Sequence, residues 1–278
     1  MPAVYAHHRF GDKALQACPS PLAREAVTAF PDLYAIGLQG PDVLFYYDPL
    51  RPNPCKAAGN ALHDAPAAPF FVRGLGKVDG SPLGRALLSY LLGMTCHFAL
   101  DSACHSYIEH RIQCTGQSHV SIETALEGRL MAQDGVDWRT VNPAGYLAVH
   151  ETACRTMARV LPASPAQLRR CLVNMKLFNG LLMPGRPLIN GLAEQALRRS
   201  GKWEEIGGLL FSALDPGEYA QSSSVLTDLF FQAVPKAAAL MDSCCAHVQS
   251  GAPLDPRFDK TYGPDPEAMA LFAAKPAD

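Results

Sequence analysis

The chain has 278 residues, of which 48% are hydrophobic and 18% are charged. A chain this apolar can bury a large core, so bulk disorder is excluded. Lys and Arg number 24 against 26 Asp and Glu. This near-neutral balance excludes strong binding to nucleic acid or acidic lipid through net charge alone.

The start of the chain, Met1 to Arg9, lacks the basic residues and apolar run of a secretory signal. The longest apolar stretch, residues 86–100, contains Ser, Thr and His and is shorter than the roughly 20 residues of a membrane span. The nine cysteines are irregularly spaced and form no CxxC pair, which favours buried thiols in a reducing compartment over a zinc ribbon or a thioredoxin-like site. We therefore expect a cytoplasmic protein without a transmembrane segment.

Helical periodicity dominates the chain and no convincing strand pattern occurs, which predicts an all-α fold. Residues 41–69 are rich in proline and are predicted to form an ordered, irregular segment. A long helix is predicted over about 83–113, in the core because its first half is apolar nearly all round. Ser118 is the expected N-cap of the next helix, which should end near Gly135. Later helices are predicted over about 143–161, 165–183, 187–200, 203–213 and 217–249, followed by an irregular tail from residue 251.

Candidate metal ligands lie on the long helix. His97, Asp101 and His105 are spaced by four residues, which places them on one helix face with a drift of only about 40° per step. Polar side chains on a buried helix need partners, and a divalent cation would supply one, since imidazole and carboxylate are zinc-type ligands. The alternative is a set of core histidines that pair with carboxylates without metal.

A second pair of residues favours the metal. His119 and Glu123 repeat the four-residue spacing on the following helix, and Asp42 and His63 lie upstream. A carboxylate that bridges two metals about 3.5–4 Å apart would give a multinuclear site. Near the N-terminus His7 and His8 compete for the same role, and we favour His7.

The candidate ligands occur along the chain in the order His7, Asp42, His63, His97, Asp101, His105, His119 and Glu123. This order resembles the zinc-dependent phospholipase C family, whose relatives include single-strand-specific zinc nucleases. The resemblance extends over residues 1 to about 130 and implies an all-α fold with a three-zinc site. It implies that Asp101 bridges two zinc ions, one completed by Asp42, His63 and His97, and the other by His7 and the processed N-terminus. His105, His119 and Glu123 would hold the third ion, and Asp42 would be the general base.

Two features depart from the family pattern. The ligating N-terminal Trp of the secreted enzymes is absent, and Pro2 would take its place if Met1 were removed. The four-residue step from Asp101 to His105 is shorter than in the family, so we expect two to three zinc ions. Cys96 and Cys104 lie off the ligand face and are predicted to pack in the core. For the aromatic residues at 45–47 and 70–71 we favour core packing over a cation–π pocket for a quaternary ammonium headgroup.

The predicted architecture is one domain over residues 1–278. It is a multi-helix bundle with a buried multinuclear zinc site, built mainly from residues 1–130 and supported by helices and a tail from 131–278. The predicted function is a zinc-dependent phosphodiester hydrolase, most like phospholipase C, in which a zinc-bound hydroxide attacks a phospholipid or another phosphodiester.

Two alternatives remain open at this point. One is a single-strand nuclease or nucleotidase of the same fold, although the chain shows no strong nucleic-acid signal. The other is a non-catalytic, zinc-stabilised helical domain in which protein ligands fill every coordination position.

Overall fold

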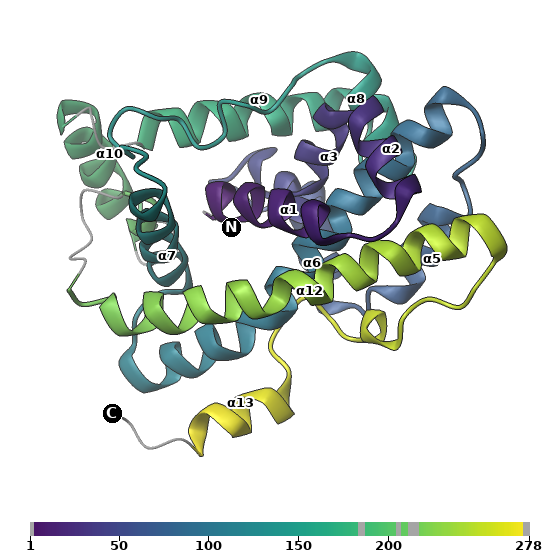
Figure 1. Ribbon diagram of the computed structural model, residues 1–278. Helices are drawn as coiled ribbons and strands as arrows, with labels where there is room; N and C mark the ends of the chain where they lie inside the picture. The colour runs from purple at the N-terminus through teal and green to yellow at the C-terminus, as the bar shows by residue number, and fades with distance from the viewer. Residues whose placement is uncertain (1–2, 183–186, 204–206, 211–216, 275–278) are drawn as a thin grey trace.

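The computed structural model describes residues 3–182, 187–203, 207–210 and 217–274. Within these residues the chain forms helices and irregular connections and no strand, which confirms the predicted all-α fold (Figure 1). In chain order the α-helices are α1 (Val4–Ala17), α2 (Pro21–Ala29), α3 (Pro31–Gly37), α4 (Pro54–Asp64), α5 (Ala68–Leu75), α6 (Pro82–Thr115), α7 (His119–Gln133), α8 (Glu151–Met157), α9 (Pro165–Leu182), α10 (Pro187–Arg199), α12 (Ala220–Ser250) and α13 (Pro266–Ala273). The described residues also form three short 3-10 helices, which are η1 (Gly40–Tyr46), η2 (Gly207–Leu209) and η4 (Pro256–Asp259).

Helix α6 is the centre of the fold. It begins at the Ser81 cap, whose hydroxyl accepts from the Gly84 amide at 3.0 Å, and ends at Gly116 in the left-handed conformation. Helices α1, α3, α7 and α12 all pack against it (Figure 1). Among the described residues α6 is the one helix long and apolar enough to cross a membrane, and 89% of its apolar window is buried inside the protein. The predicted core helix over about 83–113 is therefore confirmed.

Two glycines bring α3 and α6 into backbone contact. A Cβ on Gly93 would lie 2.3 Å from the Tyr34 carbonyl oxygen, and a Cβ on Gly37 would lie 2.2 Å from that of Tyr90. No larger residue fits at either position without a shift of a helix backbone. This close approach sets the end of α3 directly beside the ligand-bearing part of α6.

The proline-rich residues 41–69 are mostly helical, so the prediction of an irregular segment was wrong in detail. Pro41, Pro54 and Pro69 lie in the first turns of η1, α4 and α5. Proline is well suited to a first helical turn, because the amide that it lacks would have no partner within the helix there. These prolines therefore mark helix starts.

The second half of the chain departs from prediction in three places. The predicted helix over 143–161 is limited to α8, because residues 143–146 form a turn and residues 147–150 are irregular. The Asn142 side chain accepts from the Ala144 amide at the start of this turn. Of the predicted helix over 203–213, the described part contains Trp203 in helical conformation and η2, and residues 204–206 and 211–213 lie outside the described residues. The tail contains α13, whose start is capped by Asp265. The helices predicted over 165–183, 187–200 and 217–249 correspond to α9, α10 and α12, and the single-domain organisation remains a prediction.

Candidate metal centre

The fold brings all eight candidate ligands together from five elements. They are His7 of α1, Asp42 of η1, His63 of α4, His97, Asp101 and His105 of α6, and His119 and Glu123 of α7. The side chain of His97 is fully buried, whereas that of His119 is 40% exposed. The cluster therefore runs from the core to the surface.

Asp101 lies in the middle of four imidazoles. Its Oδ1 is 3.3 Å from His7 Nε2 and 3.8 Å from His105 Nε2. Its Oδ2 is 3.0 Å from His97 Nε2 and 3.8 Å from His63 Nε2. Each oxygen thus faces its own pair of imidazoles, which is the arrangement that a bridging carboxylate needs.

The remaining carboxylates complete two further groups. Asp42 Oδ1 lies 3.1 Å from His63 Nε2, and these two residues form a group with His97. On the outer side Glu123 Oε1 lies 3.1 Å from His119 Nε2 and 3.5 Å from His105 Nε2. In each group the ligand atoms lie within 4.8 Å of one another.

Backbone carbonyls fix the orientation of three of the imidazoles. The Nδ1 atoms of His63, His97 and His105 lie 2.8, 3.1 and 2.7 Å from the carbonyl oxygens of Gly59, Leu38 and Tyr262. A carbonyl oxygen only accepts, so each Nδ1 donates, and in the neutral ring Nε2 carries the lone pair. This is the usual outer-shell arrangement of metal-binding histidines.

These lone pairs point at carboxylate oxygens, which is unfavourable unless a cation or a proton lies between them. The buried Nε2 of His97 makes no hydrogen bond of proper geometry within the described residues, although Asp101 is 3.0 Å away. With bonds of about 2.0–2.2 Å and tetrahedral angles, two ligand atoms on one zinc ion lie roughly 3.4 Å apart. The observed separations of 3.0 to 3.8 Å bracket that value, so the residues fit zinc.

The electrostatics of the cluster keep its carboxylates ionised. Burial opposes the charge on Asp101, but His97 and His105 outweigh it and hold the pKa of Asp101 well below its usual range. Burial likewise opposes the charged form of His105, but Asp101 and Glu123 raise the pKa of this imidazole to about 9. Burial, with the nearby His97, lowers the pKa of His7. Without metal, the cluster thus contains ionised carboxylates beside protonated imidazole such as that of His105. A metal that binds the imidazole nitrogen would displace its proton.

A glycine lets η1 approach this cluster. Gly40 has a positive φ of 54°, and a Cβ there would lie 2.2 Å from the His97 ring. Only glycine fits both the conformation and the space. Asp42, two residues later, is brought beside His63 in this way.

Comparison with known proteins agrees with this geometry. The family model described as zinc-dependent phospholipase C matches residues 6–164, more than half of the chain. The chain belongs to the zinc-dependent phospholipase C family. The matched range contains all eight clustered residues, from His7 to Glu123. No curated protein and no solved structure matches the chain significantly.

In this member of the phospholipase C family, the residues around the candidate ligands lie as follows. His7 points at Asp101, whereas His8 stacks on Tyr146 with ring centroids 4.0 Å apart, so the preference for His7 agrees with the geometry. Pro2 lies outside the described residues. Cys96 contacts the Tyr34 hydroxyl at 3.3 Å, a core position rather than a ligand position. The ligand roles of the eight residues remain predictions.

Sequence reasoning missed the groups that support the ligands. Gly59 lies four residues before His63 on the same helix, so helical spacing could have found that carbonyl. Tyr262 is 157 residues from His105, and no local pattern signals that contact. Glu127 is a buried carboxylate that accepts from the Tyr5 amide at 3.2 Å and so holds the start of α1 near the cluster. Burial raises the pKa of Glu127 to about 8.

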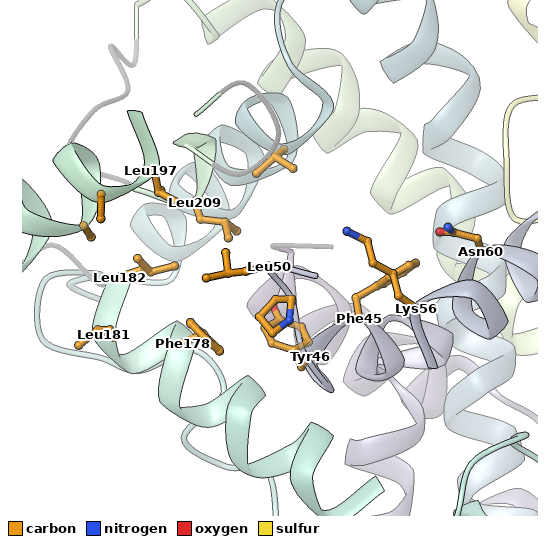
Figure 2. A pocket seen from close by; sticks show the side chains of 14 residues that line it. Phe45, Tyr46, Leu50, Lys56, Asn60, Phe178, Leu181, Leu182, Leu197 and Leu209 are labelled. Carbon is orange, nitrogen blue, oxygen red and sulfur yellow. The ribbon is translucent and has the colours of Figure 1, made fainter. Parts of the chain in front are cut away.

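The aromatic residues divide between two uses. Phe71 is fully buried and packs on Phe258, with ring centroids 4.6 Å apart, as expected for core packing. The ring centroids of Phe45 and His63 lie 5.6 Å apart. Phe45 and Tyr46 also line an apolar cavity (Figure 2). Aromatic side chains therefore form one boundary of the metal centre.

Proposed function

We propose that this protein is a zinc-dependent hydrolase of phosphodiesters, with a phospholipid as the favoured substrate class. The observation that carries the proposal is the position of Asp101 between four imidazoles, in a chain whose family is zinc-dependent phospholipase C. Zinc ions bound there would act as Lewis acids on phosphate oxygens and would lower the pKa of a bound water. Two to three ions are proposed, with the third held by His105, His119 and Glu123.

The exposure of the cluster supports an enzyme over a structural zinc domain. Structural sites are closed, whereas a catalytic site keeps a position open to water or substrate. The His119 side chain is 40% exposed while its partner Glu123 is buried, so the outer group borders solvent. We therefore propose that a phosphodiester approaches the cluster from this edge.

Asp42 is the proposed general base. Burial would raise the pKa of its carboxyl, but His63 and His97 help to lower that pKa below its usual range. A carboxylate with a low pKa stays ionised at neutral pH and can accept a hydrogen bond from the attacking water. Its role is therefore to orient the water and to receive its proton as the phosphorus–oxygen bond forms.

The test compares hydrolysis of a chromogenic phosphocholine ester, bis(p-nitrophenyl) phosphate and single-stranded DNA by the zinc-loaded protein. Asp42→Asn should lower turnover on the order of 10²–10⁴-fold while most zinc is retained. Asp242→Asn, an exposed position on α12, is the matched control and should be unchanged. If the Asp42→Asn variant hydrolyses the esters as fast as the wild type, Asp42 is not the general base. A zinc-loaded protein inactive on all three substrates would contradict the proposed hydrolase, and a preference for the DNA would favour the nuclease alternative.

A further inference from the structure

An apolar cavity adjoins the metal centre. Its volume is about 440 Å³, within the range of roughly 300–1,000 Å³ that small-molecule sites span. Residues of η1, α4, α7, α9, α10 and η2 line it, together with the connection between η1 and α4. They include Phe45, Leu50, Phe178, Leu182 and Leu197 (Figure 2). Apolar side chains predominate in the lining.

The cavity and the metal centre share a boundary at two points. Phe45 lines the cavity and lies 5.6 Å from the His63 ring. Val120 lines it as well and directly follows His119. The cavity and the metal centre are therefore neighbours through these two residues.

One face of α4 connects the two places. Lys56, Asn60 and His63 are spaced by four and three residues, so they lie on one side of the helix. The first two line the cavity, and the third belongs to the metal cluster. Figure 2 shows Lys56 and Asn60 beside Phe45 at one end of the cavity, with Leu181, Leu182 and Leu197 toward the other. The cavity is thus polar near the helix of His63 and apolar away from it.

We propose that this cavity binds one hydrocarbon chain of a lipid substrate whose phosphodiester lies at the metal centre. The inference rests on the proposed function and specifies which part of the substrate the enzyme recognises, namely the hydrocarbon chain. Of the described residues that line the cavity, Lys56 is the one charged side chain and none is a carboxylate. The described lining therefore offers no carboxylate to a cationic headgroup, whereas an alkyl chain gains from leaving water. The cavity is therefore assigned to the chain and not to the headgroup.

The test uses monomeric p-nitrophenyl alkyl phosphodiesters with chains from ethyl to decyl. Burial of a methylene contributes about 0.8 kcal/mol, so kcat/KM should rise three- to fourfold per added methylene until the cavity is full. Leu197→Trp should fill the cavity and flatten this dependence without change in zinc content or in hydrolysis of chainless bis(p-nitrophenyl) phosphate. Leu192→Trp is the matched control, because Leu192 lies on the same helix, is 68% exposed and is absent from the described lining. It should preserve the chain-length dependence.

Two outcomes would overturn the inference. One is a flat chain-length dependence in a wild-type enzyme that hydrolyses the chainless ester, which leaves the proposed function intact. The other is absence of saturable probe binding in a protein that hydrolyses none of the esters. In that case binding of the fluorescent probe dansylaminoundecanoic acid to the zinc-loaded protein is measured directly. Saturable binding that Leu197→Trp weakens about tenfold and Leu192→Trp preserves would support the cavity assignment even as the proposed function fails. Absence of such binding would overturn the assignment as well.

Discussion

Asp101 is the residue that lies between the parts of the candidate metal centre. Its two oxygens face separate pairs of imidazoles, which come from α1, α4 and α6. It is buried, and its imidazole neighbours hold its pKa low. A single carboxylate therefore has the position and the charge to serve two ions.

Asp101→Ala should release more than one equivalent of zinc per chain, because both oxygens would lose their ions together. Elemental analysis of the purified protein measures this directly. The control is Asp242→Ala, on the exposed side of α12, which should retain the wild-type zinc content. Loss of one equivalent alone would show that Asp101 does not bridge.

Zinc uptake should release protons. The pKa of His105 is about 9 without metal, because Asp101 and Glu123 outweigh the effect of burial, so this imidazole is protonated at pH 7. A zinc ligand must be neutral at Nε2. Uptake at pH 7 should therefore release at least one proton, and apparent affinity should fall about tenfold per pH unit below pH 9 for each proton released. Calorimetry in buffers of different protonation enthalpy tests this, and a heat independent of the buffer would contradict it.

The sequence indicated the eight clustered residues but not the backbone carbonyls that orient their imidazole rings. One set of three residues and one pair at four-residue spacing, with the order of the upstream residues, were enough to indicate the eight candidates. The carbonyls of Leu38 and Tyr262 left no trace in the sequence, because any residue offers a carbonyl and the contact depends on tertiary structure. The sequence favoured His7 over His8, and the direction in which α1 enters the cluster agrees with that preference.

At the scale of elements, the contact between α3 and α6 controls access of the η1 segment to the ligands. Leu38 follows α3 directly and its carbonyl accepts from His97 Nδ1. The contact itself depends on Gly37 and Gly93, where backbone meets backbone. A change in the spacing of these two helices should therefore reach the metal centre.

Gly93→Ala should destabilise the protein by about 1–3 kcal/mol and lower its zinc content, since its Cβ would lie 2.3 Å from the Tyr34 carbonyl oxygen. The matched control is Gly191→Ala on α10, where a Cβ meets nothing within 4 Å. That change should be neutral or stabilising by up to about 1 kcal/mol, because alanine is the better helix former. Urea unfolding compares the two, and equal stability of both variants would contradict the close contact.

Helices with strong apolar periodicity were predicted correctly from the sequence. The proline-rich segment was not, because proline occurs both in irregular chain and in the first turn of a helix. The long helices α6, α9 and α12 were visible as apolar patterns. Prolines at residues 41–69 suggested irregular chain, yet they occupy the first turns of helices. Helix α13 is short and has no buried residue, so its sequence contains little core pattern to detect.

At the scale of the whole molecule, the metal centre joins α1, η1, α4, α6 and α7. Ions bound to the folded chain stabilise it by mass action, and without them buried carboxylates and protonated imidazoles must compensate one another. Chelation of the zinc should lower the unfolding temperature, and added zinc should restore it. An unchanged unfolding temperature after complete removal would show that the centre does not hold these elements together.

The most direct test of the metal centre is an anomalous difference map from crystals of the purified protein, recorded at the zinc absorption edge. Two or three peaks are predicted, with Asp101 oxygens and the Nε2 atoms of His63 and His97 at about 2.0–2.2 Å from an ion. The third peak should lie between His105, His119 and Glu123. A map without a peak among these side chains, from protein saturated with zinc, would contradict the account.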